Sequence, residues 1–337
     1  MIQSFRSTTL ILSLWMLPLL GTAQSSASPS SPPHASRRQG SHAPATRPAI
    51  TGVSHLAVYA TDPIKTADFY QRIVGCEKTS DFEDHPGVRY TFNSAQYVEV
   101  LPLPASAGED RLDHIAFRTA NVEALRLYLQ GHGVPVPDRI NIGQDANKTK
   151  WLEVKDFEGN RVQFVEDAKA AAGQPAAPDT KLVGHHIIHI GMAIRNRAEA
   201  DSFYRDVLGF KLYWHGGVDP DQTDWVSMQV PDGTDWLEYM LTSGPSGSGI
   251  PYRISQKALG VLNHLSVGVP NMAAAVATLK SENRVGPRGN GPQIGRDGKW
   301  QFNDFDPDNT RLEYMEFTPV REPCCAPFTG PHPAEGN

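Results

Sequence analysis

Residues Gly52–Gly75 read GVSHLAVYATDPIKTADFYQRIVG, and residues His186–Gly209 read HIIHIGMAIRNRAEADSFYRDVLG. In both stretches a His, His55 or His189, stands fourteen residues before a Phe-Tyr pair. The residues around each His are β-prone, and the apolar residues near each Phe-Tyr pair recur at helical spacing before a Gly that ends the helix. The pattern therefore predicts two copies of one unit, a strand followed by a helix.

A second pair of matching segments follows these units. LDHIAFRTANVEAL, from Leu112, and LNHLSVGVPNMAAA, from Leu262, share a His, an Asn seven residues later and a helix-forming stretch. DFEGNRVQFVE, from Asp156, matches DPDNTRLEYME, from Asp306. Each half of the chain thus repeats the unit twice, and the economical interpretation is an α+β fold of four βαβββ modules.

Four pairs of residues set the register of the repeat. The intervals between halves are 150 residues for His114 to His264 and for Gln163 to Glu313, 134 for His55 to His189, and 139 for Glu99 to Glu238. Insertions in loops explain the unequal intervals. A repeat this regular in spacing and composition indicates two tandem domains of the same architecture.

The N-terminal end of the chain differs in composition from the repeats. Arg6 is followed by an almost unbroken apolar run, Leu10 to Leu20, and by small residues that suit cleavage after Ala23. The run is far shorter than the roughly 20 residues of a membrane-spanning helix, so residues 1–23 are predicted to be a secretory signal peptide. The expected location is secreted or periplasmic, with no membrane anchor after cleavage.

Low-complexity stretches mark the remaining boundaries. We expect a disordered linker over residues 24–48, an N-terminal domain over 50–168, a linker over 169–181, a C-terminal domain over 182–319 and a flexible tail over 320–337. Ser, Pro and Ala dominate the first linker, and Ala, Gly and Pro the second. Neither linker has the periodicity that would bury an apolar face.

Charge and cysteine content exclude several classes of protein. The formal net charge is −6, and no run of Lys or Arg gives the basic footprint of a nucleic-acid-binding protein. Three cysteines, Cys76, Cys324 and Cys325, are too few for a disulfide framework or a Cys-based zinc site. The stretch GPSGSG lacks the Lys-Ser/Thr of a phosphate-binding loop. A small-molecule substrate is the expected partner. The sequence leaves open whether the protein forms a homodimer.

Four residues of the C-terminal half are candidate metal ligands, because each is a His or Glu flanked by apolar or aromatic residues in a predicted strand. They are His189, Glu238 in DWLEYM, His264 in NHLSV and Glu313 in TRLEYME. Side chains alternate between the faces of a strand, so a Glu between Leu and Tyr faces either water or a polar interior. A buried carboxylate needs a cation beside it. Two imidazoles and two carboxylates suit Zn²⁺, Ni²⁺, Co²⁺, Mn²⁺ or Fe²⁺.

This arrangement resembles the vicinal-oxygen-chelate superfamily, which includes glyoxalase I, bleomycin-resistance proteins and extradiol dioxygenases. The resemblance covers about residues 50–319, and FYRDVLGF (Phe203–Phe210) and DPDNTRLEY (Asp306–Tyr314) are among its usual motifs. It implies that each pair of modules curls into an eight-stranded sheet that holds one metal by a residue from each of four strands. In the C-terminal domain those residues would be His189, Glu238, His264 and Glu313.

The N-terminal domain carries a changed version of the same set. The resemblance places His55, Glu99, His114 and Gln163 at the four positions, so an amide replaces the last carboxylate. Gln can ligate a metal through its oxygen but cannot act as a base. This second site is expected to bind metal weakly, to hold substrate or to be a structural remnant. The other histidines singled out, His85, His132, His185, His186 and His215, are expected at the surface.

By resemblance, the leading hypothesis is a secreted glyoxalase-I-like lyase or isomerase with one divalent transition metal in each active domain. The metal would chelate vicinal oxygens of a small substrate and stabilise an enediolate. Glu313 is the first candidate for the proton-transfer base and Glu238 the second, since a carboxylate beside a metal can shuttle a proton. The alternatives are an extradiol dioxygenase with Fe(II) or Mn(II) at His189, His264 and Glu313, and a non-catalytic small-molecule-binding protein like the bleomycin-resistance proteins.

Overall fold

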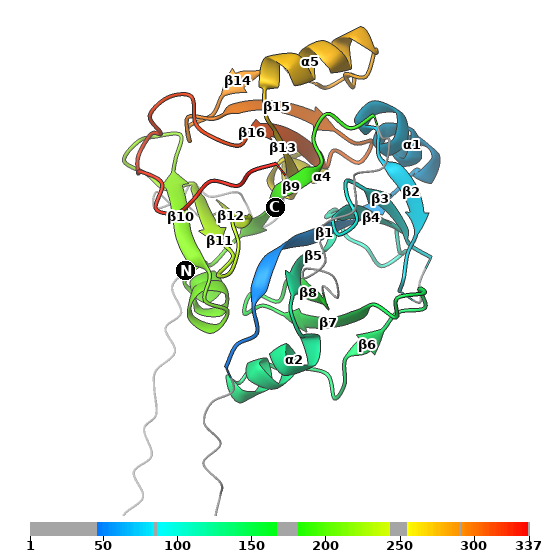
Figure 1. The fold of residues 1–337 in the computed structure, drawn as a ribbon, viewed down its shortest axis with the longest axis vertical. Helices are drawn as coiled ribbons and strands as arrows, with labels where there is room; N and C mark the ends of the chain where they lie inside the picture. Colours follow the sequence, from blue (N-terminus) through cyan, green and yellow to red (C-terminus); the bar gives the residue numbers. More distant parts are fainter. Residues whose placement is uncertain (1–45, 84–85, 167–180, 243–254, 290, 336–337) are drawn as a thin grey trace, which may run out of the picture. The chain divides into compact units, whose positions relative to one another are not determined.

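The computed structural model describes residues 46–83, 86–166, 181–242, 255–289 and 291–335 (Figure 1). Residues Ala43–Asn337 form one compact unit, which contains both repeats. The expected signal peptide lies outside the described residues, as do most of the two expected linkers, 24–48 and 169–181. Among the described helices, none is both long and apolar enough to cross a membrane.

The first half of the chain forms an eight-stranded sheet. Its strands are β1 (Ile50–Ala60), β2 (Glu77–Ser80), β3 (Val88–Thr91), β4 (Tyr97–Pro102), β5 (Leu112–Thr119), β6 (Asn141–Ile142), β7 (Lys150–Lys155) and β8 (Arg161–Glu166). Their order in the sheet is β2-β3-β4-β1-β5-β8-β7-β6, with β1 parallel to β4 and antiparallel to β5. Two βαβββ modules therefore meet at the central pair β1 and β5.

The second half repeats this sheet. Its strands are β9 (His186–Ile194), β10 (Lys211–Gly216), β11 (Trp225–Gln229), β12 (Trp236–Leu241), β13 (His264–Val269), β14 (Gln293–Ile294), β15 (Trp300–Phe305) and β16 (Arg311–Glu316). The order β10-β11-β12-β9-β13-β16-β15-β14 matches that of the first sheet position by position. The predicted α+β fold of four βαβββ modules is confirmed.

The strand register places the candidate ligands at equivalent points of the two sheets. Each sheet has one central residue that pairs on both sides with a candidate ligand: Ala57 with Glu99 and His114, and Gly191 with Glu238 and His264. The fourth position, Gln163 or Glu313, pairs with the residue two after the second His in both sheets. The repeat predicted from the sequence therefore holds residue by residue at the centre of each sheet.

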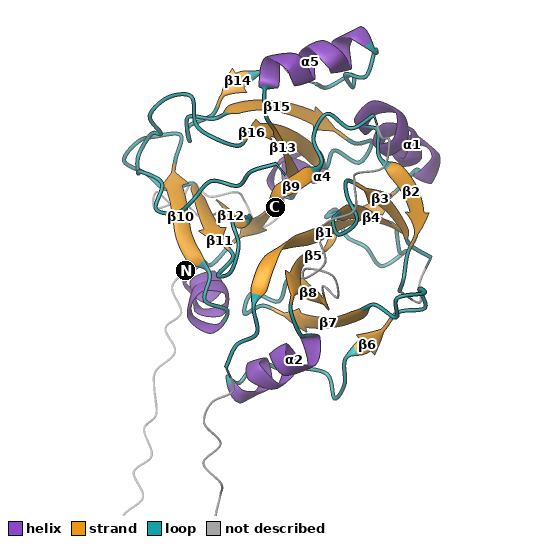
Figure 2. Cartoon of the chain, in the orientation of Figure 1, coloured by secondary structure: helices purple, strands orange, loops and turns teal. Residues whose placement is uncertain are grey.

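Short helices connect the strands (Figure 2). They are α1 (Pro63–Asp68), which continues as the π-helix η1 (Phe69–Val74), α2 (Val122–Gly131), α3 (Arg197–Ala200), which continues as the π-helix η2 (Asp201–Val207), α4 (Gln256–Leu262) and α5 (Met272–Ser281). Asn121 and Asn271 cap α2 and α5 by accepting a hydrogen bond from the backbone N–H three residues later. Gly75 and Gly209 follow the first helix of each half with φ of 101° and 79°. The predicted Gly stops are confirmed, because these left-handed conformations favour glycine.

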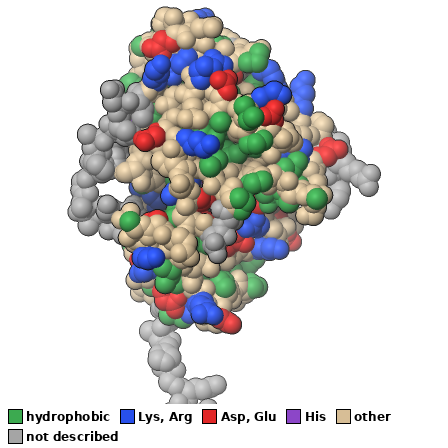
Figure 3. All heavy atoms as spheres, turned by 90° about the vertical axis from the view of Figure 1, so that its right-hand side faces the viewer, with side chains coloured by type: hydrophobic (Ala, Val, Ile, Leu, Met, Phe, Trp, Pro, Cys, Tyr) green, Lys and Arg blue, Asp and Glu red, His purple; other side chains and the backbone are tan. Residues whose placement is uncertain are grey.

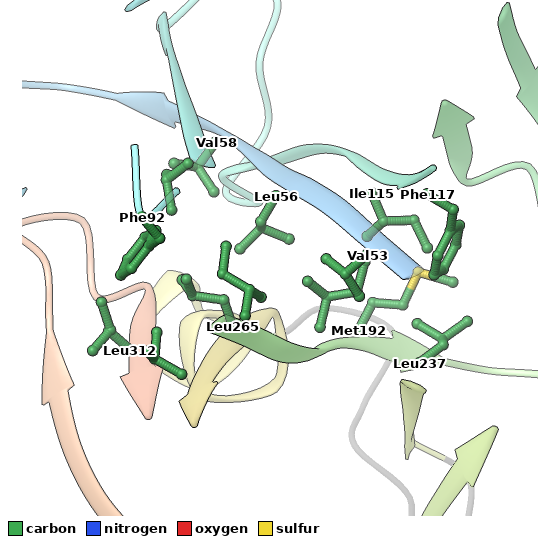
Figure 4. Close-up of a cluster of buried hydrophobic side chains, with 14 of the residues drawn as sticks. Val53, Leu56, Val58, Phe92, Ile115, Phe117, Met192, Leu237, Leu265 and Leu312 are labelled. Atoms are coloured by element: carbon green, nitrogen blue, oxygen red, sulfur yellow. The ribbon is translucent and has the colours of Figure 1, made fainter. Parts of the chain in front are cut away.

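One hydrophobic core joins the two halves. Val53 and Leu56 of β1 pack in the same cluster as Met192 of β9 and Leu265 of β13 (Figure 4), and none of the four is more than 1% exposed. Successive side chains of a strand point to opposite faces, so Leu56 faces this core while His55 faces the other side of the sheet. The two tandem domains therefore pack as one body, and each central strand serves both the core and a candidate site.

The Tyr side chain of each Phe-Tyr pair forms a hydrogen bond with a residue of the other half of the chain. The Tyr204 hydroxyl donates to Asp156 Oδ2 at 3.0 Å, and the Tyr70 hydroxyl donates to Asp306 Oδ2 at 3.4 Å. Oδ1 of each Asp accepts a backbone N–H in the turn that precedes β8 or β16. A buried hydroxyl needs such a partner. Motifs repeated in the two halves therefore also hold the halves together.

Residues 320–335, for which the sequence predicts a flexible tail, follow the second sheet. Three backbone carbonyls of this segment accept side-chain hydrogen bonds: Cys324 from Trp214, Pro331 from Gln229, and Ala334 from His186. The ring of Phe328 lies 4.8 Å from that of Tyr213. The tail is anchored by partners far away in sequence, which its Pro-rich composition does not reveal.

The cysteines have two different states. Cys324 and Cys325 are joined to each other in a disulfide, and Cys76 is free and buried. Arg296 donates a hydrogen bond to Cys324 Sγ at 2.9 Å. This disulfide joins two adjacent residues and does not link distant strands.

Charged side chains of both signs are scattered over the face drawn in Figure 3. Lys and Arg side chains lie among Asp and Glu side chains there. The described residues of this face therefore do not present the uniform positive field that steers a polyanion.

Candidate metal centres

Four strands of the second sheet bring the C-terminal ligand candidates together. His189 lies on β9, Glu238 on β12, His264 on β13 and Glu313 on β16. Nε2 of His189 is 3.0 Å from Nε2 of His264. The Glu238 carboxylate lies 3.3 Å from His264 Nε2, and the Glu313 carboxylate 3.4 Å from His189 Nε2. All four predicted residues converge around the two imidazoles.

These distances fit a metal held among the four side chains. Two atoms that each lie about 2.1 Å from one metal are separated by roughly 3.0 Å in octahedral and 3.4 Å in tetrahedral geometry. The three separations of 3.0, 3.3 and 3.4 Å lie in this range. His189, Glu238 and His264 also offer ligand atoms that all lie within 4.8 Å of one another. The mixture of nitrogen and oxygen suits a divalent transition metal.

Packing around the imidazoles fixes which nitrogen faces the centre. His264 Nδ1 donates to the Leu262 carbonyl at 2.8 Å, which leaves the lone pair on Nε2. The His264 ring lies over Gly191 of β9, where a Cβ would overlap it. His189 stacks on Trp236 with 4.5 Å between ring centroids. Because both imidazoles are fully buried, the fold sets their positions before a metal binds.

Gly191→Ala is expected to weaken metal binding at the C-terminal centre by roughly 10- to 100-fold, the effect of losing a ligand's supporting partner. The added methyl group would push the His264 ring away from His189. Titration calorimetry with Mn²⁺ measures the change. Gly131→Ala is the matched control, since its Cβ would meet no atom within 4 Å. Equal affinities in the two variants would show that Gly191 does not position the ring.

Burial favours the neutral form of both imidazoles, which is the form that binds metals. Burial lowers the pKa of His189, and burial with the nearby Arg311 charge lowers the pKa of His264 to about 3. The two carboxylates differ from each other. Burial raises the pKa of Glu238. For Glu313 burial acts in the same direction, but Arg311 at 3.8 Å and His189 outweigh it and lower the pKa to about 2.

The first sheet builds a similar centre from β1, β4 and β5. Nε2 of His55 is 2.9 Å from Nε2 of His114, and Glu99 Oε2 lies 3.5 Å from each. Ligand atoms of these three residues all lie within 4.8 Å of one another. Tyr97 stacks on His55 with 4.4 Å between ring centroids. Three of the four predicted N-terminal residues therefore have the geometry of a metal centre.

The fourth N-terminal position has a different partner. Gln163 is fully buried on β8, and its Nε2 donates to Glu83 Oε1 at 2.6 Å. Asp81 and Glu83 join Glu99 in a second group whose ligand atoms lie within 4.8 Å of one another. Burial and the neighbouring Asp81 carboxyl raise the pKa of Glu99 to about 11. Sequence analysis missed Asp81 and Glu83, because they lie in a loop without a counterpart motif in the other half.

Asp113 is a supporting residue that the sequence analysis did not single out. Its Oδ2 accepts a hydrogen bond from His114 Nδ1 at 2.7 Å, and Tyr59 and Arg161 donate to Oδ1. A carboxylate behind a ligating His fixes the tautomer and makes the ligand nitrogen more basic. The sequence did contain a hint of this role, because Asp113 directly precedes the candidate ligand His114 in the chain.

A buried Lys next to the C-terminal centre was also missed. Lys299 Nζ lies 4.8 Å from the centre of the Trp236 ring, which stacks on His189. It donates to the Tyr213 hydroxyl at 3.3 Å, and Phe328 of the tail faces it at 5.3 Å. Burial lowers the pKa of Lys299. This single Lys, which stands between Gly and Trp, belongs to no spaced motif, so the sequence did not identify it as a site residue.

The expectation that His186 lies at the surface is wrong. His186 is 3% exposed, and its ring nitrogens bond to the Ala334 carbonyl and to Asp235 Oδ1, both at 2.8 Å. Its partners come from the tail and from the start of β12, which sequence spacing cannot bring together. His85 lies outside the described residues.

Two regions of the chain, residues 52–164 and 186–314, match the sequence model of the Glyoxalase/Bleomycin resistance protein/Dioxygenase superfamily. The chain belongs to this superfamily. The matched regions coincide with the two sheets, and each includes its whole predicted ligand set, so the vicinal-oxygen-chelate resemblance is confirmed. A search of curated protein sequences finds no match.

Solved structures with the superfamily fold include both dioxygenases and a glyoxalase. The 2,3-dioxygenase LapB from Pseudomonas sp. KL28 is 15% identical, with a TM-score of 0.58 over 86% of this chain and 96% of its own. The Mn(II)-bound glyoxalase from Novosphingobium aromaticivorans is 18% identical, with a TM-score of 0.56 over 80% and 83%. Homoprotocatechuate 2,3-dioxygenase from Brevibacterium fuscum, in complex with 3,4-dihydroxyphenylacetate, is 17% identical, with a TM-score of 0.54 over 80% and 82%. At these identities the similarity shows a shared fold.

Proposed function

We propose that the chain is a metal-dependent lyase or isomerase of the glyoxalase type, active at the C-terminal centre. The observation that carries this proposal is the fourth candidate ligand, Glu238, whose carboxylate lies 3.3 Å from His264 Nε2. A set of two His and one carboxylate leaves positions open for dioxygen, and a second carboxylate occupies one of them. The similar fold of a Mn(II)-bound glyoxalase supports the same choice.

The two carboxylates of the C-terminal centre can divide the work of proton transfer between them. When bound, a divalent metal would supply Lewis acidity to two neighbouring oxygens of a small substrate. Glu313 is the first candidate for accepting a proton from the adjacent carbon, because Arg311 and His189 hold it as an anion. Glu238 is the second, and its side chain is 15% exposed against 2% for Glu313. An isomerase removes a proton from one carbon and returns it to the next, which two carboxylates on different strands can share.

The surroundings of the C-terminal centre favour a small substrate that carries negative charge. Trp236 and the tail residue Phe328 contribute apolar surface, and Lys299 places its ammonium group between them. A positive charge in such a buried position stabilises developing negative charge more than it would in water.

A second candidate function is an extradiol dioxygenase. His189, His264 and Glu313 supply the three ligands of that class, and LapB and homoprotocatechuate 2,3-dioxygenase have similar folds. In this alternative Glu238 would leave the metal or give way to the substrate.

Proton exchange and oxygen uptake distinguish the two candidates. Full-length protein loaded with Mn²⁺, Ni²⁺ or Zn²⁺ should incorporate solvent deuterium next to the carbonyl of hydroxy-ketones or 2-oxoaldehyde adducts, as measured by NMR in D₂O. Protein loaded anaerobically with Fe²⁺ should consume no oxygen when catechols are added. Oxygen uptake with ring cleavage would overturn the proposal in favour of the dioxygenase.

Export remains a prediction from residues 1–23 and bears on the substrate. Glutathione is chiefly a cytosolic thiol, so an exported enzyme would seldom meet its hemithioacetals. We therefore propose a vicinal-oxygen substrate other than a glutathione adduct.

A further inference from the structure

The disulfide between Cys324 and Cys325 stands at the start of the tail that follows the second sheet. A disulfide stabilises a fold mainly by restricting the unfolded chain, and it does so more when it closes a longer loop. Two neighbouring residues close almost no loop, so this bond adds little stability by that route. A role other than cross-linking distant segments therefore fits it better.

The two cysteines of this disulfide have different surroundings. Cys325 is an exposed residue, whereas Cys324 is half-buried. Arg296 donates from Nη2 to Cys324 Sγ at 2.9 Å and from Nε to the Gly217 carbonyl at 3.0 Å, which holds the guanidinium in place. A positive charge beside a sulfur favours the thiolate over the thiol. Cys325 thus lies where a reductant can approach from solution, and Cys324 can leave as a stabilised thiolate.

The backbone of Cys325 has a conformation that depends on its setting. Its φ of 76° lies in the left-handed region, which residues with a side chain rarely adopt. The disulfide ring contains the peptide bond between the two cysteines, so breaking the ring frees Cys325 to return to an ordinary conformation. The direction in which the chain leaves Cys325 would then change.

The residues after Cys325 pack against β10, beside which the tail is drawn in red in Figure 1. Thr329 donates its backbone N–H to the Tyr213 carbonyl at 2.9 Å. The ring of Phe328 lies 4.8 Å from that of Tyr213, and the Tyr213 hydroxyl forms a hydrogen bond with His332 Nδ1. A change of chain direction at Cys325 would displace all three of these contacts.

Tyr213 connects the tail to the C-terminal centre. Its ring lies 5.1 Å from that of Trp236, which stacks on His189. Its hydroxyl accepts a hydrogen bond from the buried Lys299. The packing of the tail on β10 therefore bears on the side chains that surround this centre.

We propose that the Cys324–Cys325 disulfide is a redox-sensitive site at which a dithiol reductant releases the tail from β10. A thiolate of the reductant attacks Cys325 Sγ, the S–S bond breaks, and Cys324 leaves as a thiolate beside Arg296. The second thiol of the reductant then displaces Cys325 from the mixed disulfide. The reductant ends as a disulfide, and the protein has gained two electrons and two protons. The inference does not depend on the reaction proposed for the C-terminal centre.

Thiol labelling of the native, full-length protein tests the reduction. Dithiothreitol without denaturant, followed by a maleimide, should label Cys324 and Cys325 and leave the buried Cys76 unlabelled, as mapped by mass spectrometry. Protein that has not been reduced should carry no label at Cys324 or Cys325. Label at both residues before reduction, or reduction that occurs only when Cys76 is labelled too, would overturn the proposal.

Hydrogen exchange tests the release of the tail. After reduction, the Thr329 N–H should exchange faster by roughly tenfold or more, because its hydrogen bond to Tyr213 opens. Peptides from β1 and β5 of the first sheet should exchange at an unchanged rate. Unchanged protection of Thr329 in fully reduced protein would show that the disulfide does not hold the tail.

Two double variants separate the backbone of Cys325 from its sulfur. Cys324→Ser/Cys325→Ser cannot form the disulfide and should exchange like the reduced wild type, with or without dithiothreitol. Cys324→Ser/Cys325→Gly also lacks the disulfide, but glycine adopts a positive φ without steric cost, so Thr329 should exchange more slowly than in the Ser/Ser variant. Wild-type protection in the Ser/Ser variant, or equal exchange in the two variants, would contradict the mechanism.

Discussion

His264→Ala is expected to remove the metal of the C-terminal centre, and with it about one equivalent of the transition metal bound by the full-length protein. His264 Nε2 is 3.0 Å from His189 Nε2 and 3.3 Å from the Glu238 carboxylate, so its loss opens the middle of the site. We expect the affinity to fall by more than the roughly 10- to 100-fold that follows loss of a supporting residue. Metal analysis of the reconstituted protein measures this loss.

Two further variants make the result specific. His132→Ala changes an exposed His and should leave the metal content unchanged. His114→Ala changes the equivalent ligand of the first sheet and should remove the N-terminal metal while the C-terminal equivalent stays. If reconstituted wild-type protein binds no metal, the result would favour the alternative of a small-molecule-binding protein of the bleomycin-resistance kind.

Glu313→Gln is expected to lower turnover by about 10²- to 10⁴-fold, the usual contribution of a general base. The amide keeps the shape of the side chain but cannot accept the proton. Most of the metal should remain, because His189, Glu238 and His264 still offer three ligand atoms within 4.8 Å of one another. The measurement is kcat on the substrate found by the deuterium-exchange screen, alongside the metal content of the same preparation.

Comparison with Glu238→Gln ranks the two carboxylates. A larger loss in Glu238→Gln than in Glu313→Gln would make Glu238 the principal base, and full turnover in Glu313→Gln would exclude Glu313 from proton transfer. Glu322→Gln, at an exposed position of the tail, is the control for the change from Glu to Gln.

The sequence by itself determined the duplicated fold and the positions of the C-terminal candidate ligands. The alternation of side chains along a strand and the 150-residue interval from His114 to His264 depend only on the order of residues in the chain. Both can therefore be recognised without the structure. The register then places Glu238 and His264 on either side of Gly191, as the repeat requires. Asn121 and Asn271 at the helix starts were predictable for the same reason, because a cap depends on residues within one turn.

Only the tertiary structure decided what surrounds those candidate ligands. Glu83 meets Gln163 across 80 residues, and the tail residue Ala334 meets His186 across 148. Neither contact has a periodic signal, since each depends on how loops fold back over the sheets. The shared core that packs Leu56 with Leu265 is of the same kind: hydrophobicity predicts that both residues are buried, but only the assembled sheets decide that they lie in one core.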